Sequence, residues 1–171
     1  ECADKASDPV TKGDDALGTF IRLVEENPYT GTAEQIVTLS QGIAEAGTQL
    51  DASTFSLYKE QSGIGDKVFS KLKVIGKTFL KLTETQRRDI VKGLPSSYST
   101  IHLLCSISPE ELVTGVKSKN ITPAISVREA TQYTKQVRFP QLAAINSEKG
   151  RWGAKQEHLW SVFRPEEMPL G

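Results

Sequence analysis

Helix-start signals are the feature of this sequence that most constrains its fold. From Thr83 onward, a Ser or Thr is followed repeatedly, three residues later, by Glu or Gln, which is the pattern of a capping box. The pairs are Thr83 with Gln86, Ser108 with Glu111, and Ser126 with Glu129. No stretch shows the alternation of apolar and polar residues that is typical of a half-buried strand. We therefore expect an all-α protein, a compact bundle of about seven to nine short helices.

Apolar spacing and stop signals predict where these helices lie. Asp14 or Asp15 opens the first helix, and Asn27-Pro28 stops it. The predicted helices cover roughly residues 14–27, 32–50, 55–61, 66–79, 83–92, 96–105, 108–118 and 126–137. We expect residues 1–13 to be disordered, residues 14–138 to form the helical domain, and residues 139–171 to form a C-terminal extension.

Length and composition are those of an ordinary soluble globular protein. The 171 residues suffice for one domain with a buried core. No apolar run is long enough to span a bilayer, and no signal-peptide pattern opens the chain. Cys2 and Cys105 do not make a disulfide framework, and we expect Cys105 to be a buried, reduced, inert thiol. These features favour a cytoplasmic protein without membrane contact. The chain begins at Glu1 rather than Met, which is consistent with an excised or processed fragment.

The stretch FSLYKEQSGIGDKVFSKLKVIGKTF (residues 55–79) predicts two helices joined by a tight turn. Ser53 or Thr54 caps the first helix. Gly63 suits a left-handed residue after that helix, because glycine has no Cβ to clash. Asp66 opens the second helix, where a negative charge suits the helix dipole. These parts are those of a helix-turn-helix near residues 53–77, a motif that reads DNA.

The second helix of this motif has an apolar face and a basic face. Phe69, Leu72 and Gly76 share the apolar face, with Val68 and Ile75 at its edges. Lys67, Ser70, Lys71 and Lys73 point away from it.

One position departs from the motif. Tyr58, Ile64, Phe69 and Leu72 fill its usual apolar positions. Lys59 stands where a small residue is expected, four before the turn glycine, so its side chain must lean outward. The alternative interpretation is a helical hairpin with a solvated lysine face.

Charge is distributed unevenly, although the net charge is zero. Residues 1–53 carry ten acids and three bases, for a net charge of −7. Residues 54–92 carry nine bases and four acids, for a net charge of +5, and residues 93–171 have a net charge of +2. A basic block on helical segments is what a phosphate-binding face requires. It coincides here with the helix-turn-helix candidate.

The segment after the motif, LPSSYSTIHLLCSISPEELVTGVKSKNITPAISVREA (residues 94–130), resembles the helical DNA-binding region of ParB-like partition and repressor proteins and related plasmid or phage proteins. The matching residues are the Leu94-Pro95 turn, Asn120-Ile121-Thr122-Pro123, and Ser126-Val127-Arg128-Glu129-Ala130. The resemblance covers roughly residues 52–135. The N-terminal nucleotide-binding and arginine-rich segment of clamp-forming partition proteins is absent from the sequence, so no nucleotide switch is implied.

This resemblance implies that the second helix of the motif enters the major groove of double-stranded DNA. Asp66, Lys67, Val68, Ser70 and Lys71 would then lie nearest the bases, and Lys73 and Lys77 nearest the phosphates. The residues that we expect to bind DNA are Lys67, Val68, Ser70, Lys71, Lys73, Lys77, Arg87 and Arg88. The expected function is regulatory or partition-related, exerted by a symmetric dimer on a two-fold site.

A non-enzymatic protein-interaction adaptor is the other function that the sequence suggests. The acidic N-terminal third, or Trp152, Trp160 and Phe163 in the C-terminal extension, would then dock a partner or a second copy. Folding of that extension onto the core is the alternative. We expect no catalysis, metal or cofactor, because His102 and His158 stand far apart without ligand spacing.

Overall fold

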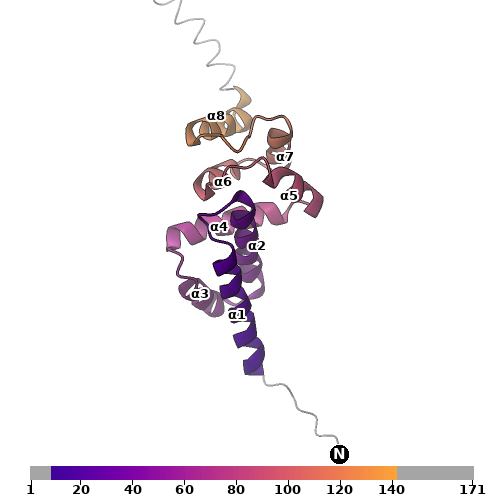
Figure 1. The fold of residues 1–171 in the computed structure, drawn as a ribbon. Coiled ribbons are helices and arrows are strands. Elements are labelled where there is room, and N and C mark those ends of the chain that lie inside the picture. Colours follow the sequence, from indigo (N-terminus) through magenta and orange to yellow (C-terminus); the bar gives the residue numbers. More distant parts are fainter. Residues whose placement is uncertain (1–8, 142–171) are drawn as a thin grey trace, which may run out of the picture. The chain divides into compact units, whose positions relative to one another are not determined.

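The computed structural model describes residues 9–141, with side chains from residue 15 onward. This part of the chain contains eight α-helices and no strand, which confirms the all-α fold (Figure 1). The helices are α1 (Pro9–Glu26), α2 (Ala33–Gln49), α3 (Ala52–Gln61), α4 (Asp66–Leu80), α5 (Glu84–Val91), α6 (Tyr98–Leu104), α7 (Pro109–Lys117) and α8 (Val127–Arg138).

Contacts divide the chain into two units, one ending at Thr134 and the other beginning at Lys135. The first unit holds α1 to α7 and most of α8. In the second unit, the backbone N–H of Phe139 donates to the carbonyl of Lys135 at 2.9 Å, and the Arg138 guanidinium lies 5.4 Å from the Phe139 ring centre. Residues 1–8 and 142–171, which include most of the expected disordered N-terminus and nearly all of the expected extension, lie outside the described residues.

Capping hydrogen bonds begin the helices where the sequence predicts them in most cases. Both bonds of a capping box form at Thr83 and at Ser108. They also form at Ser126, whose Oγ accepts from the Glu129 N–H while the Glu129 carboxylate accepts from the Ser126 N–H. Ser97 caps α6, as one of the two candidates there. Local side-chain chemistry therefore determines these helix starts.

Two helix starts differ from expectation. Asp51, not Ser53 or Thr54, caps α3. Its carboxylate accepts from the Ser53 hydroxyl at 2.6 Å and from the Thr54 backbone N–H at 2.9 Å, and these bonds hold the Asp51 pKa well below its ordinary value. The two hydroxyl residues support the cap rather than supply it. In addition, α1 begins at Pro9, ahead of Asp14 or Asp15 and inside the segment expected to be disordered, because proline suits the first turn of a helix.

The packing of α4 against α2 forms the centre of the first unit. Among the described helices, this pair makes the most extensive contact. In Figure 1, α4 crosses α2, with α1 and α3 on one side of α4 and α5, α6 and α7 on the other. The buried faces contribute Ile36, Leu39 and Ile43 from α2, and Phe69, Leu72, Ile75 and Phe79 from α4. Ile75, expected at the edge of the apolar face, is fully buried, whereas Val68 is half-buried.

Gly76 lets the two helices approach closely. A Cβ at this position would collide with the backbone carbonyl of Ser40 on α2. Backbone atoms cannot move aside as the end of a flexible side chain can. The absence of a side chain at Gly76 therefore sets the distance between α2 and α4.

The described helices were compared with the length and hydropathy that a membrane-spanning helix requires. None of those between residues 9 and 141 is both long and apolar enough to cross a bilayer.

The substitution Gly76→Ala tests the close approach of α2 and α4. We expect it to lower the free energy of unfolding by about 1–3 kcal/mol, because the overpacked methyl group outweighs the gain in helix propensity. Gly18→Ala is the matched control, since Gly18 is an exposed helical glycine with open space where a Cβ would lie. That control should raise the free energy of unfolding by about 0.5–1 kcal/mol. Urea titration followed by circular dichroism measures both, and equal effects would contradict the packing.

Candidate nucleic-acid interface

The turn between α3 and α4 contains the left-handed glycine that the sequence predicts. Gly63 has a φ of 67°, the left-handed conformation that glycine adopts without strain. The Ser62 hydroxyl accepts from the Ile64 N–H at 3.2 Å, which turns the chain so that Ile64 is buried. All four apolar positions expected of the motif are buried; they are Tyr58, Ile64, Phe69 and Leu72. The turn therefore attaches α3 and α4 to a common core.

Lys59, the residue that departs from the motif, leans outward. Its ammonium forms an ion pair with the Asp66 carboxylate at 2.7 Å, and 34% of its side chain is exposed. Because Asp66 is the first residue of α4, the pair bridges the turn. An exposed pair of this kind stabilises by less than about 1 kcal/mol. Its main effect is to accommodate the long side chain without disturbing the core.

One face of α4 points to solvent and is basic. The exposed residues recur every three or four positions, so they form a stripe opposite the buried face. This α4 stripe consists of Lys67, Ser70, Val74 and Lys77, and Lys81 continues it just beyond the helix; Asp66 and Leu80, at the two ends of α4, are exposed as well. Asp66, at the start of the helix, is the only acidic residue of α4 and is already paired with Lys59. The stripe is therefore a surface of positive charge.

Lys71 and Lys73 lie along the two edges of this stripe and are half-buried. The Lys71 ammonium is 5.8 Å from the centre of the Tyr98 ring, and the Lys73 ammonium is 4.7 Å from the centre of the Phe55 ring. Aromatic faces attract such cations weakly, by about 0.5–1 kcal/mol at exposed sites. Both lysines are thus held beside the stripe rather than at its centre.

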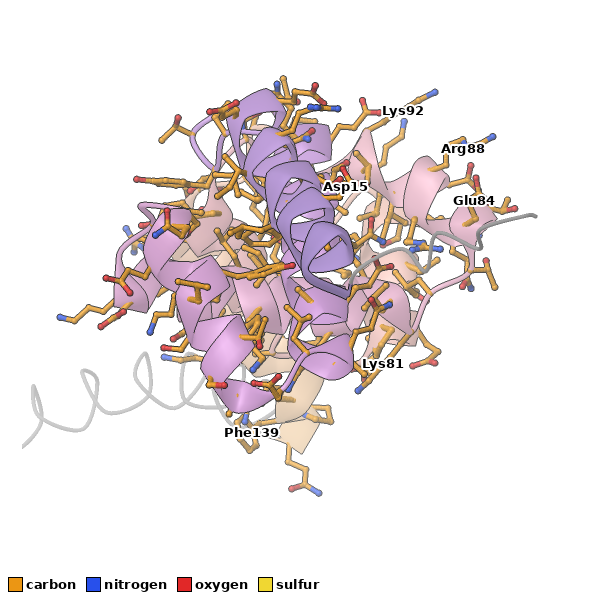
Figure 2. All side chains as sticks on the ribbon, turned by 90° about the horizontal axis from the view of Figure 1, so that it is seen from below. Asp15, Lys81, Glu84, Arg88, Lys92 and Phe139 are labelled. Carbon is orange, nitrogen blue, oxygen red and sulfur yellow. The ribbon has the colours of Figure 1, made fainter. Side chains whose placement is uncertain are left out.

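Arg87 and Arg88 belong to a different surface. They lie on α5 and line a groove that α5 shares with α2. Arg88 donates to the Glu84 carboxylate at 2.8 Å, and Figure 2 shows Arg88 well apart from Lys81. The structure therefore brings Lys67, Ser70 and Lys77 together, places Lys71 and Lys73 beside them, and separates the two arginines from them.

Sequence reasoning missed Val74 and Lys81, which complete the stripe. Val74 is 43% exposed and lies in its middle. The signal was present in the sequence, since positions 70, 74, 77 and 81 continue the same helical period from Lys67. Because an apolar residue is normally assigned to the core face of a helix, Val74 was not predicted to be part of the exposed stripe.

His102 lies on α6, and Cys105 is the C-terminal cap of that helix. Cys105 is half-buried rather than fully buried, and desolvation of its thiol raises the pKa to about 12, which favours the unreactive protonated form. His102 is half-buried. Its pKa is lowered mainly by burial and to a smaller extent by the positive charge of Lys71. Within the part of the chain that the structure describes, no three His, Cys, Asp or Glu side chains gather as metal ligands.

Comparison with known proteins gave no match to a family model, to a curated sequence or to a solved structure. Trp152, Trp160 and Phe163, the candidate partner-binding residues, lie outside the described residues.

The substitution Gly63→Ala tests the turn. We expect it to lower the free energy of unfolding by about 1–2 kcal/mol, because a Cβ is strained at positive φ. Gly65→Ala, two residues away, is the comparison: Gly65 has a φ of −61° and open space around it, so its substitution costs only the poorer N-cap that alanine makes for α4, about 0.5 kcal/mol. Thermal unfolding of the two variants distinguishes these effects. A turn that tolerated alanine equally at both positions would not have the geometry described.

Cys105 provides a second test. In a Cys2→Ser background, alkylation by iodoacetamide at about pH 8 should be much slower for the folded protein than for the protein unfolded in urea. The shift of the Cys105 pKa from 9.0 to about 12 lowers the thiolate fraction about a thousandfold at that pH. Mass spectrometry over time measures both rates, and equal rates would show that burial does not suppress the thiolate.

Proposed function

We propose that this protein binds double-stranded DNA through the α4 stripe. The observation that carries the proposal is the arrangement of Lys67, Lys77 and Lys81 along the one face of α4 that the core leaves exposed. The face opposite the stripe is buried against α2 and α6. Helices that read DNA combine these two properties, a buried face that fixes the helix and an outward face that carries donors.

The physical roles of the stripe residues follow from their chemistry. A helix fits the major groove, where side chains of the outward face reach base edges. Lysine ammonium groups at the ends and edges of the stripe neutralise phosphates and release counterions. Ser70 can donate to or accept from a base edge, and Val74 can contact the methyl group of thymine. Lys71 and Lys73, held over aromatic rings, suit the phosphates on either side.

The wider role that we propose is a regulatory or partition-related one in the cytoplasm, exerted on a plasmid, a phage genome or a chromosome. Support comes from the resemblance of residues 94–130 to the helical region of ParB-like proteins. A symmetric dimer on a two-fold site would place one α4 stripe in each of two half-sites.

A protein-interaction adaptor is the second candidate. It is favoured by exposed acids on α1 and α2, which include Glu25, Glu26 and Glu45. Among the described residues, none of the three forms an ion pair. Such a surface would dock a basic partner without using the α4 stripe.

Removing the charge of the stripe tests the proposed function. The variant Lys67→Gln/Lys77→Gln/Lys81→Gln should weaken binding to a random duplex, measured by fluorescence anisotropy at several salt concentrations. For each lysine that neutralises a phosphate, the slope of log affinity against log salt should fall by about 0.9. All three side chains are exposed, so the fold should be preserved.

Three other exposed basic residues supply the matched control, because their substitution removes the same charge from other elements. The control variant is Lys117→Gln/Lys119→Gln/Arg128→Gln. It should bind nearly as well as the parent protein. Equal loss in both triple variants would mean that binding follows net charge, and an absence of binding by the parent at low salt would contradict the proposal. In that case, loss of partner binding in Trp152→Ala or Trp160→Ala would favour the adaptor.

A further inference from the structure

A groove of about 390 Å³ lies between α2 and α5. Each helix contributes residues at the spacing i, i+3, i+4 and i+7, which places them on one face. Those that decide its chemistry are Glu34, Val37 and Gln41 on α2, and Arg87 and Val91 on α5, with Lys92 at the end of that helix. The volume falls within the range of sites for small molecules, which is about 300–1,000 Å³.

Positive charge dominates this α2–α5 groove. Three basic side chains line it, against the carboxylates of Glu34 and Glu84. Arg88 and Glu84 pair with each other at 2.8 Å, so their charges largely cancel. Arg87 and Lys92 form no ion pair with any described residue, and only Glu34 opposes them. Figure 2 shows Glu84, Arg88 and Lys92 projecting on the same side of the molecule.

An unsatisfied donor lies in the wall of the groove. The side-chain amide nitrogen of Gln41 is shielded from water and has no hydrogen-bond acceptor among the described residues. A buried donor without an acceptor is destabilising. Gln41 also lines the groove, where an acceptor from a ligand would satisfy this donor. Together with the half-buried Arg87, the wall therefore offers donors in excess of acceptors.

We infer that the α2–α5 groove binds a small anion. Its phosphate or carboxylate oxygens accept from Arg87, Gln41 and Lys92, since charged donors favour such oxygens. Val37 and Val91 supply an apolar wall for the rest of the molecule. Glu34 opposes the anion and limits its affinity. This inference does not depend on DNA binding, because the groove and the α4 stripe are built from different residues.

Isothermal titration calorimetry at constant ionic strength, with pyrophosphate and separately with citrate, tests the inference. At least one probe should bind the full chain with a dissociation constant at or below about 1 mM. Binding of pyrophosphate alone identifies a phosphate site, and binding of citrate alone identifies a carboxylate site. If neither probe binds, the inference is wrong.

Two substitutions at the groove should act in opposite directions. Arg87→Gln should weaken binding about tenfold, because it removes charged hydrogen bonds. Glu34→Gln should tighten binding about threefold or more, because it removes the opposing charge. Arg128→Gln, which removes an exposed arginine on α8, is the control and should change nothing. Equal weakening by Arg87→Gln and Arg128→Gln would show that the anion does not bind in the groove.

Gln41→Leu separates a ligand-binding role from a structural one. It removes the unsatisfied donor, so the ligand-free protein should become more stable, with a higher midpoint of thermal unfolding. The same substitution should weaken binding of the probe severalfold. If stability rises and affinity stays unchanged, Gln41 does not contact the anion, and its assignment as a donor is wrong.

Discussion

The close crossing of α2 and α4 is the contact on which the rest of the structure depends. It is possible because Gly76 presents no Cβ to the Ser40 carbonyl. Around that point, the apolar faces of both helices exclude water, with Phe69 and Phe79 among the fully buried side chains. Burial of such side chains stabilises by about 1.5–3 kcal/mol each, so this contact accounts for a large share of the stability of the first unit.

The same crossing decides which residues of α4 remain available for binding. Once one face is buried against α2 and α6, helical geometry leaves the stripe from Lys67 to Lys81 exposed to solvent, with Lys71 and Lys73 half-buried at its edges. The turn at Gly63 and the Lys59–Asp66 pair attach α3 at the start of this helix. The stripe is thus held on a rigid element, and rigid placement is what a surface needs to fit a groove of fixed width.

Helix starts were the most predictable part of the fold, because they depend on local chemistry. Thr83, Ser108 and Ser126 cap their helices through hydrogen bonds within three residues, and a sequence shows such bonds directly. Asp51 was missed because three neighbouring residues can all act as caps, and only the observed bonds distinguish them. The separation of Arg87 from the lysines depends on how α5 packs on α2, and this tertiary contact leaves no local signal.

In the candidate site, too, the features that depend on local sequence could be predicted, and those that depend on tertiary contacts could not. Helical periodicity was sufficient to place Lys67, Ser70 and Lys77 on one face, and would have added Val74 and Lys81. Periodicity could not show that aromatic rings hold Lys71 and Lys73 at the edges, because Tyr98 belongs to α6 and Phe55 to α3.

The most direct test of DNA binding by α4 is an NMR titration of the isotopically labelled protein with a short duplex. Amide shifts concentrated at the exposed positions of residues 66–81 are the expected result, whereas shifts confined to α1, to α5 or to the end of the chain would contradict it.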